Sequence, residues 1–135
     1  MKKIEHIGIA VKDLKTANNL YSKLLNTAPY KMEEVESENV NTSFFQVGES
    51  KIELLEGTSS DSPISKFIDK KGEGVHHIAF EVDDVEKVKQ KLLSAGGSLH
   101  GEVVTFSVTG KGTVTMVYTR DPEGNIVELQ KWEQD

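Results

Sequence analysis

The sequence of 135 residues contains no cysteine, and this absence removes two kinds of chemistry at once. Without thiols the chain can form no disulfide bond and can offer no thiolate nucleophile. A cysteine-free composition is compatible with a reducing compartment. We therefore expect a cytoplasmic protein whose fold depends on its hydrophobic core.

Long apolar runs and an excess of positive charge are also missing. No stretch approaches the roughly 20 apolar residues of a membrane-spanning helix. The opening MKKIEHIGIAV resembles a signal peptide only in its lysines, because Glu5 and His6 interrupt its short apolar run. The 22 acidic residues outnumber the 16 basic ones, which argues against nucleic acid as the main partner. We expect neither a membrane nor a nucleic acid to be a partner.

The sequence contains an internal repeat. HIGIAVKDLKTANNLYSKLL begins at His6, and HIAFEVDDVEKVKQKLLSAG begins at His77. Each copy reads as a short strand, then Val-x-Asp, then an amphipathic helix. Asp13 and Asp84 are the predicted helix N-caps. The predicted apolar stripes consist of Leu20, Leu24 and Leu25 in the first copy and of Val88, Leu92 and Leu93 in the second.

Three β-type segments follow each predicted helix. They are YKMEEVES, NTSFFQVG and KIELLEG in the first copy, and SLHGEVVTFSV, TVTMVYTR and NIVELQKW in the second. We therefore predict one α+β domain over 1–135, built from two paired βαβββ modules. Module one covers about 1–57, and module two covers about 73–135. Between them lies a linker of about 58–72, with a short helix near Pro63 to Lys70.

Histidine and glutamate recur at equivalent places in the two copies. His6 corresponds to His77 on the first strand of each copy, and Glu53 corresponds to Glu128 on the last strand. Paired modules related by a pseudo-twofold axis would bring these four side chains into one cleft of a cupped mixed sheet. Two imidazoles and two carboxylates suit a divalent ion such as Co²⁺, Zn²⁺, Ni²⁺ or Mn²⁺. We predict a metal site, with water completing the coordination sphere.

The segment GVHHIAFEVDD places two histidines side by side, and alternation along a strand separates them. His77 shares a face with Ala79, whereas His76 shares a face with Ile78 and Phe80. We expect His77 to face the site and His76 to be structural. Taken singly, each of the two histidines would ordinarily be interpreted as structural, and each of the two glutamates as solvated. Their recurrence in both copies favours a metal site.

Several sequence segments resemble those of the vicinal oxygen chelate superfamily, which includes glyoxalases, bleomycin resistance proteins and extradiol dioxygenases. IEHIGIAVKDL, KIELLEG and DSPISKFIDKKGEGVHHIAFEVDD are most similar to the methylmalonyl-CoA epimerase family. The ending MVYTRDPEGNIVELQKW looks more like glyoxalase-type members. The two parts join between Glu86 and Gly101, and natural divergence, recombination and engineering all remain open. The resemblance implies a homodimer and implies that the metal ligands are His6, Glu53, His77 and Glu128.

The epimerase resemblance implies 1,1-proton transfer at C2 of methylmalonyl-CoA through a metal-stabilised enolate, with Glu128 as the base. Certain epimerases carry a further glutamate where this sequence has Thr42, and the nearest carboxylates, Glu36 and Glu38, lie earlier in the chain. The second acid is therefore left unassigned. Candidate cations for the CoA diphosphate are Lys66, Lys70 and Lys71, although surface lysines are ordinarily just solvated.

Two alternatives stay open. A glyoxalase I-like lyase would use the same four ligands on a hemithioacetal of glutathione. A non-catalytic ligand-binding or resistance protein of the same fold is the other, but a pure binder does not require four metal-type ligands. An extradiol dioxygenase normally uses three protein ligands, so Glu53 would be surplus there.

Overall fold

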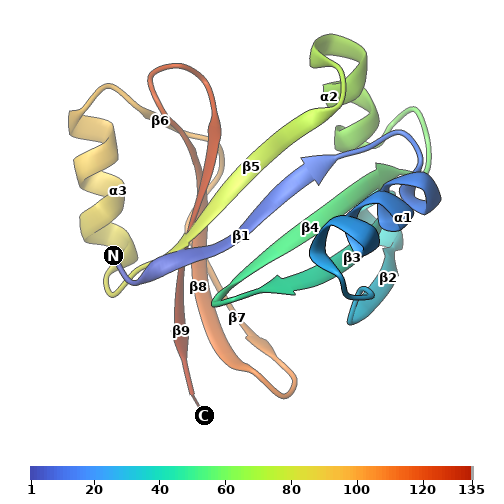
Figure 1. The fold of residues 1–135 in the computed structure, drawn as a ribbon. Helices are drawn as coiled ribbons and strands as arrows, with labels where there is room; N and C mark the ends of the chain where they lie inside the picture. The colour runs from blue at the N-terminus through green and yellow to red at the C-terminus, as the bar shows by residue number, and fades with distance from the viewer. Residues whose placement is uncertain (135) are drawn as a thin grey trace. The chain divides into compact units, whose positions relative to one another are not determined.

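The computed structural model describes residues 1–134 and divides into two compact units. The N-terminal unit is His6–His76, and the C-terminal unit is Met1–Glu5 together with the described residues from His77 onward. Both boundaries fall inside strands, β1 (Lys3–Ala10) and β5 (Gly74–Glu81), so the chain passes between the units as extended backbone. Each unit contributes its own strands and helices (Figure 1).

The N-terminal unit is a four-stranded sheet with two helices. Its strand order is β2-β3-β4-β1; β1 runs parallel to β4, and the other pairs are antiparallel. Figure 1 shows α1 lying across β3 and β4. After β1 the elements are α1 (Leu14–Leu25), β2 (Lys31–Val35), the 3-10 turn η1 (Glu36–Glu38), β3 (Val40–Val47), β4 (Ser50–Gly57) and α2 (Pro63–Lys71).

Helix α1 begins where the sequence predicts. The carboxylate of Asp13 accepts hydrogen bonds from the backbone N–H groups of Lys15 and Thr16, which confirms this residue as the N-cap. The predicted apolar stripe was partly wrong, because Leu20 and Leu24 are exposed. The buried face is instead made by Leu14, Ala17, Tyr21 and Leu25, which pack on Val11, Phe45 and Leu54. Their spacing of three and four residues keeps them in one line, whereas Leu20 and Leu24 lie to its side.

Helix α2 covers a second cluster on the opposite face of the same sheet. Ser62, fully buried, caps the helix through its hydroxyl, which accepts a hydrogen bond from the Ile64 N–H, and Pro63 occupies the first turn. The cluster consists of Ala10, Val40, Leu55 and Ile64, with Val35, Phe67 and Ile68 packed against it. The two helices therefore bury the two faces of one sheet.

The C-terminal unit repeats the arrangement with one difference. Its strand order is β5-β9-β8-β6, with β7 also paired to β8, and β5 runs parallel to β9. Asp84 caps α3 through the Lys87 N–H, and α3 packs over a core of Val82, Val85, Val117 and Leu129. The elements after β5 are α3 (Val85–Ser94), β6 (Ser98–Leu99), β7 (Val104–Val108), β8 (Gly112–Arg120) and β9 (Ile126–Glu133).

The difference is a broken strand. The segment Ser98–Val108, predicted as one strand, forms β6 and β7 on the same neighbour, β8. The break follows the hydrogen bond from His100 N–H to Tyr118 C=O and contains Gly101, whose φ is +143°. A left-handed glycine turns the backbone out of the ladder, so pairing stops and resumes later.

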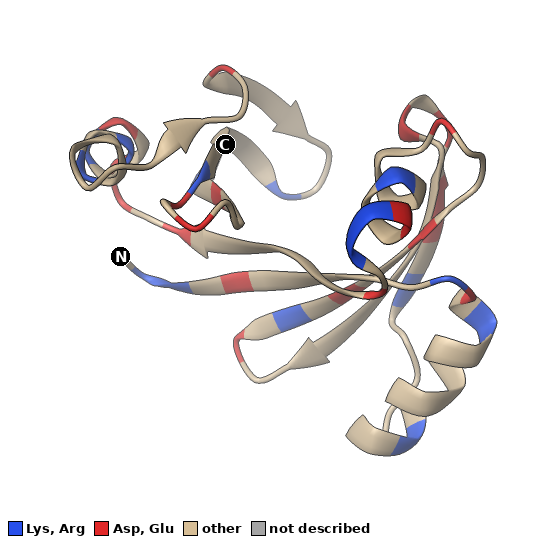
Figure 2. Ribbon diagram, turned by 90° about the horizontal axis from the view of Figure 1, so that it is seen from above, with Lys and Arg blue, Asp and Glu red and all other residues tan. Residues whose placement is uncertain are grey.

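The predicted α+β class is confirmed, and each unit carries the predicted βαβββ order apart from the broken strand. None of the helices within residues 1–134 combines the length and hydropathy that a membrane span requires. Figure 2 shows that α1 carries only basic charges, whereas α2 and α3 carry charges of both signs.

Candidate functional site

In the N-terminal unit, His6 and Glu53 form a pair on neighbouring parallel strands. Glu53 on β4 lies opposite Gly8 on β1, so the two side chains stand diagonally on one face of the sheet. The distance from His6 Nε2 to Glu53 Oε1 is 3.7 Å, and both side chains are largely buried. Gly8 has no side chain that could lie between them.

In the C-terminal unit, His77 and Glu128 form the same pair. Glu128 on β9 lies opposite Ala79 on β5, which again puts a small residue two positions after the histidine. His77 Nε2 lies 3.9 Å from Glu128 Oε1. Both residues are buried, at 7% and 3% exposure. The recurrence seen in the sequence is therefore a recurrence of strand register.

Each pair offers one imidazole nitrogen and one carboxylate oxygen that could coordinate a metal ion. Buried nitrogen and oxygen donors without sulfur suit divalent ions of borderline hardness. A buried carboxylate also needs compensation by hydrogen bonds or positive charge, which an imidazole or a cation supplies. The residues of each pair therefore fit a divalent metal chemically.

His76, the neighbour of His77, has a different environment. Its ring packs edge-on against Phe67 of α2 with the ring centroids 4.9 Å apart. This is the kind of contact expected of a structural histidine, and it gives the two adjacent residues different environments.

Two residues that lie beside Glu128, Gln130 and Trp132, were not predicted from the sequence as part of the site. The Gln130 side-chain amide donates a hydrogen bond to Glu128 Oε2, and Trp132 Nε1 donates to Gln130 Oε1 over 2.8 Å. These residues alternate along β9 and so share one face of the sheet. The signal was present in the ending NIVELQKW, where polar and aromatic residues recur at every second position.

Thr42 stands where certain epimerases carry a further glutamate, and the residues around it do not identify the second acid of the proposed reaction. Thr42 is buried on β3, and its hydroxyl donates a hydrogen bond to the backbone carbonyl of Glu33 over 3.2 Å. Glu36 and Glu38 lie in η1, beyond the end of β2. The carboxylate in register with Thr42 is that of Glu33 on β2, which forms an ion pair with Lys31. The candidate cations Lys66, Lys70 and Lys71 are exposed on α2.

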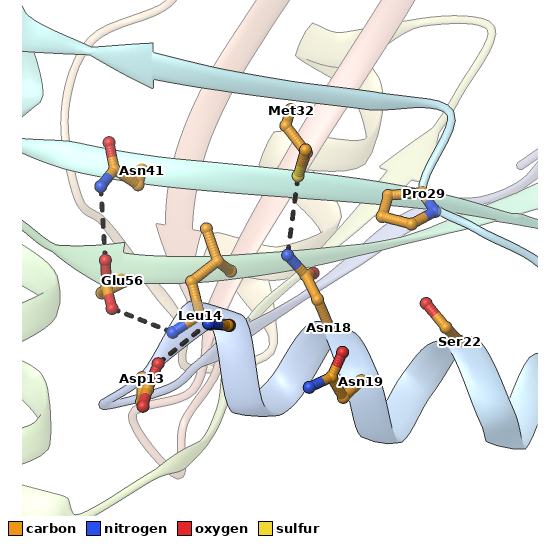
Figure 3. Close-up of a pocket in the computed structure, with 10 residues that line it drawn as sticks. Asp13, Leu14, Asn18, Asn19, Ser22, Pro29, Met32, Asn41 and Glu56 are labelled. Atoms are coloured by element: carbon orange, nitrogen blue, oxygen red, sulfur yellow. Dashed lines mark hydrogen bonds between the residues drawn. The ribbon is translucent and has the colours of Figure 1, made fainter.

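A groove lies on the other face of the N-terminal sheet, between α1 and the β2–β3 hairpin (Figure 3). Glu56 closes one end, where it accepts hydrogen bonds from the Leu14 N–H and from the Asn41 amide. Asp13 lines the same end, and a hydrogen bond from the Thr16 hydroxyl lowers the pKa of its carboxyl group. Because neighbouring strand residues point to opposite faces, this groove does not contain the His6–Glu53 pair.

These observations define the class of protein. The Glyoxalase/Bleomycin resistance protein/Dioxygenase superfamily matches residues 5–113, which is most of the chain. The chain belongs to this superfamily, and the resemblance seen in the sequence is confirmed.

The chain is also similar to individual proteins of known sequence and structure. The chain is 32% identical to human mitochondrial methylmalonyl-CoA epimerase over 96% of its length, covering 73% of that protein. It is 37% identical to the uncharacterized protein YqjC of Bacillus subtilis, with 96% and 91% of the two chains covered. A variant of Streptomyces coelicolor methylmalonyl-CoA epimerase in complex with 2-nitronate-propionyl-CoA superposes with a TM-score of 0.78 at 27% identity, covering 98% of this chain and 95% of that one.

Proposed function

We propose that this protein is a divalent-metal-dependent epimerase that acts on methylmalonyl-CoA or a closely related acyl-CoA thioester. The main support for this proposal is the strand register, which is the same in both units. It places His6 beside Glu53 in one unit and His77 beside Glu128 in the other. The similarity to methylmalonyl-CoA epimerases over 96% of the chain supports the choice of substrate class.

We further propose that the four side chains bind one metal ion together, as ligands from the two modules of a single domain. Four protein ligands leave open positions for two oxygens of the substrate, as in catalytic metal sites generally. The identity of the metal is proposed only as Co²⁺, Zn²⁺, Ni²⁺ or Mn²⁺, the ions that a mixed imidazole and carboxylate set accepts.

The reaction proposed is inversion at C2 through an enolate. A bound divalent ion supplies a Lewis acid for the negative oxygen of the enolate. Glu128 removes the proton from C2 as general base, and a second acid, which is left unassigned, returns a proton to the opposite face of the enolate. The burial of Glu128 keeps bulk water away from the carboxylate.

Deuterium exchange at C2 of methylmalonyl-CoA, followed by mass spectrometry in D₂O, tests this proposal. We expect metal-loaded protein to introduce one deuterium, and we expect chelator-treated protein and Glu128→Gln to lose the activity. Metal-loaded, folded protein that introduces no deuterium would contradict the proposed reaction.

A glyoxalase I-like reaction is the second candidate, and the ending RDPEGNIVEL favours it. The same four residues would serve as ligands, and the substrate would be the hemithioacetal of glutathione. Thioester formation from methylglyoxal and glutathione, in place of exchange on methylmalonyl-CoA, would favour this candidate. A bound ligand with neither activity would favour a non-catalytic binding protein of the same fold.

We also propose that the protein works as a cytoplasmic homodimer. The absence of cysteine is the sequence observation behind the compartment, and the family resemblance is the one behind the dimer. Light scattering at micromolar concentration tests the dimer directly. A mass equal to one chain would contradict it.

A further inference from the structure

We propose that Gln130 and Trp132 act as positioning residues that fix the orientation of Glu128, so that a single carboxylate oxygen, Oε1, faces the metal. This inference rests on the proposed function, since it assigns Glu128 as a ligand. It adds two residues to the site and states how each one acts.

The three residues form a ladder on one strand. Glu128, Gln130 and Trp132 occupy alternate positions of β9, so their side chains stand on the same face. Glu128 and Gln130 are buried, at 3% and 6% exposure. Buried polar side chains are held in one rotamer when all their hydrogen-bonding groups are satisfied.

The chemistry of the donors fixes the direction of every hydrogen bond. The indole N–H of Trp132 can only donate, so the atom of Gln130 that faces it must be the amide oxygen. The amide nitrogen of Gln130 then points the other way and donates to Glu128 Oε2. Oε2 is thereby engaged by Gln130, and Oε1 lies 3.9 Å from His77 Nε2.

The other copy of the repeat lacks this device. Glu53 corresponds to Glu128, and two residues later the N-terminal unit has Leu55, which packs in the apolar cluster under α2. The fourth position along is Gly57, where the C-terminal unit has Trp132. The hydrogen-bonded ladder is therefore specific to Glu128. This asymmetry agrees with Glu128, rather than Glu53, having the more demanding role.

Trp132 also supplies a signal that reports on the ladder. It is the only tryptophan of the sequence, and its ring N–H is two hydrogen bonds from the proposed ligand. We expect addition of Co²⁺ or Zn²⁺ to metal-free protein to change the tryptophan emission, with an endpoint of one ion per chain.

Gln130→Met tests the positioning role, because methionine is close to glutamine in size and cannot donate a hydrogen bond. We expect the dissociation constant for Zn²⁺, measured by chelator competition well below the melting temperature, to rise by about 10–100-fold. The absorption spectrum of bound Co²⁺, which depends on coordination number, should change as Glu128 gains rotational freedom. Trp132→Phe, which removes the donor to Gln130, should give a smaller effect in the same direction.

Gln90→Met is the matched control. Gln90 also donates to a carboxylate, that of Glu86, but the pair lies exposed on α3. We expect its metal affinity to equal that of the wild type. Circular dichroism establishes that each variant is folded at the temperature of the titration.

The outcomes separate this inference from the proposed function. Wild-type affinity and an unchanged Co²⁺ spectrum in folded Gln130→Met would overturn the positioning role and leave the metal site intact. A wild-type protein that binds neither ion would overturn both. An equal loss of affinity in Gln90→Met would assign the effect to general destabilisation and would also overturn the positioning role.

Discussion

Adjacent histidines at 76 and 77 give the sharpest contrast in the molecule, because one peptide bond separates two environments. His76 packs against an aromatic ring of α2, and His77 faces a buried carboxylate on β9. Strand alternation alone produces this difference. The same alternation predicted from the sequence which of the two would face Glu128.

His77→Ala and His76→Ala therefore form a matched pair of variants. We expect His77→Ala to weaken Zn²⁺ binding by about 100-fold or more, because a proposed ligand is lost. We expect His76→Ala to keep its metal affinity and to melt a few degrees lower, since the contact with Phe67 is lost. Chelator competition and thermal melting measure the two effects. Equal metal affinities for both variants would contradict the assignment.

Each of the two glutamates lies opposite a small residue on the neighbouring strand. Gly8 faces Glu53, and Ala79, which is fully buried, faces Glu128. A larger side chain at either position would occupy the space beside the carboxylate.

Ala79→Leu should therefore weaken metal binding by about 10-fold without removing any proposed ligand. Ala10→Leu is the control, because Ala10 is equally buried on the corresponding face of β1 but lies opposite Leu55. Both variants overpack a core position and should lose stability. Retained affinity in Ala79→Leu, with lost affinity in Ala10→Leu, would run against this account.

At the element scale, helix α1 begins at Asp13, an aspartate whose charge contributes to stability. The Thr16 hydroxyl, followed by the backbone N–H of Thr16, holds the pKa of Asp13 below its ordinary value. A carboxyl group with a lowered pKa in the folded state stabilises that state when ionised. This contribution is complete above about pH 4 and is lost as the pH falls through the folded-state pKa.

Asp13→Asn keeps a capping oxygen and removes the titrating group. We expect the melting temperature of the wild type to fall more steeply than that of Asp13→Asn as the pH drops below about 4. Asp61→Asn, at an exposed turn position, provides the comparison. Parallel acid limbs for the wild type and Asp13→Asn would show that the cap charge is not coupled to folding.

The connection from β4 into α2 depends on a close approach. A Cβ atom at Gly57 would lie 2.0 Å from Ser65 Oγ and 2.9 Å from Ser62 Oγ. The sequence marks Gly57 only as the last residue of a strand, so the constraint becomes visible in three dimensions alone.

Gly57→Ala should lower the free energy of unfolding by about 1–3 kcal/mol, because the added methyl group must displace the side chains of Ser62 and Ser65. Gly57→Ala combined with Ser65→Ala should recover part of this loss, since the nearer of the two clashing atoms is gone. Urea denaturation measures both values. A double variant as unstable as the sum of its single variants would place the strain elsewhere.

Much of the fold was predictable from local signals. The caps at Asp13 and Asp84 and the helix from Pro63 follow from short-range chemistry that the sequence displays directly. The break after Leu99 was not predictable, because an isolated glycine in a strand pattern is compatible with either continuation or interruption. The side of α1 that faces the sheet was misjudged, since three leucines outweighed the smaller Ala17 and the polar-ended Tyr21.

The candidate site was predictable only where the repeat reported on it. His6, Glu53, His77 and Glu128 have counterparts in the other copy, and the comparison of the copies singled them out. Gln130 has no such counterpart, because its equivalent is Leu55. Its hydrogen bonds depend on side-chain geometry along β9, which no spacing rule specifies.

At the scale of the whole molecule, the proposed function requires all four ligands, and neither histidine–glutamate pair alone would suffice. A single imidazole and a single carboxylate bind a divalent ion weakly, whereas four ligands provide the coordination of a stable protein site.

Metal stoichiometry in wild type, His6→Ala and His77→Ala tests this claim most directly, by elemental analysis after equilibration with buffered Zn²⁺. The account predicts one ion per wild-type chain and a loss of bound metal in both variants, because each removes a ligand from the same site. Two ions per chain, or a His6→Ala protein that retains the full wild-type affinity, would contradict a site shared by the two pairs.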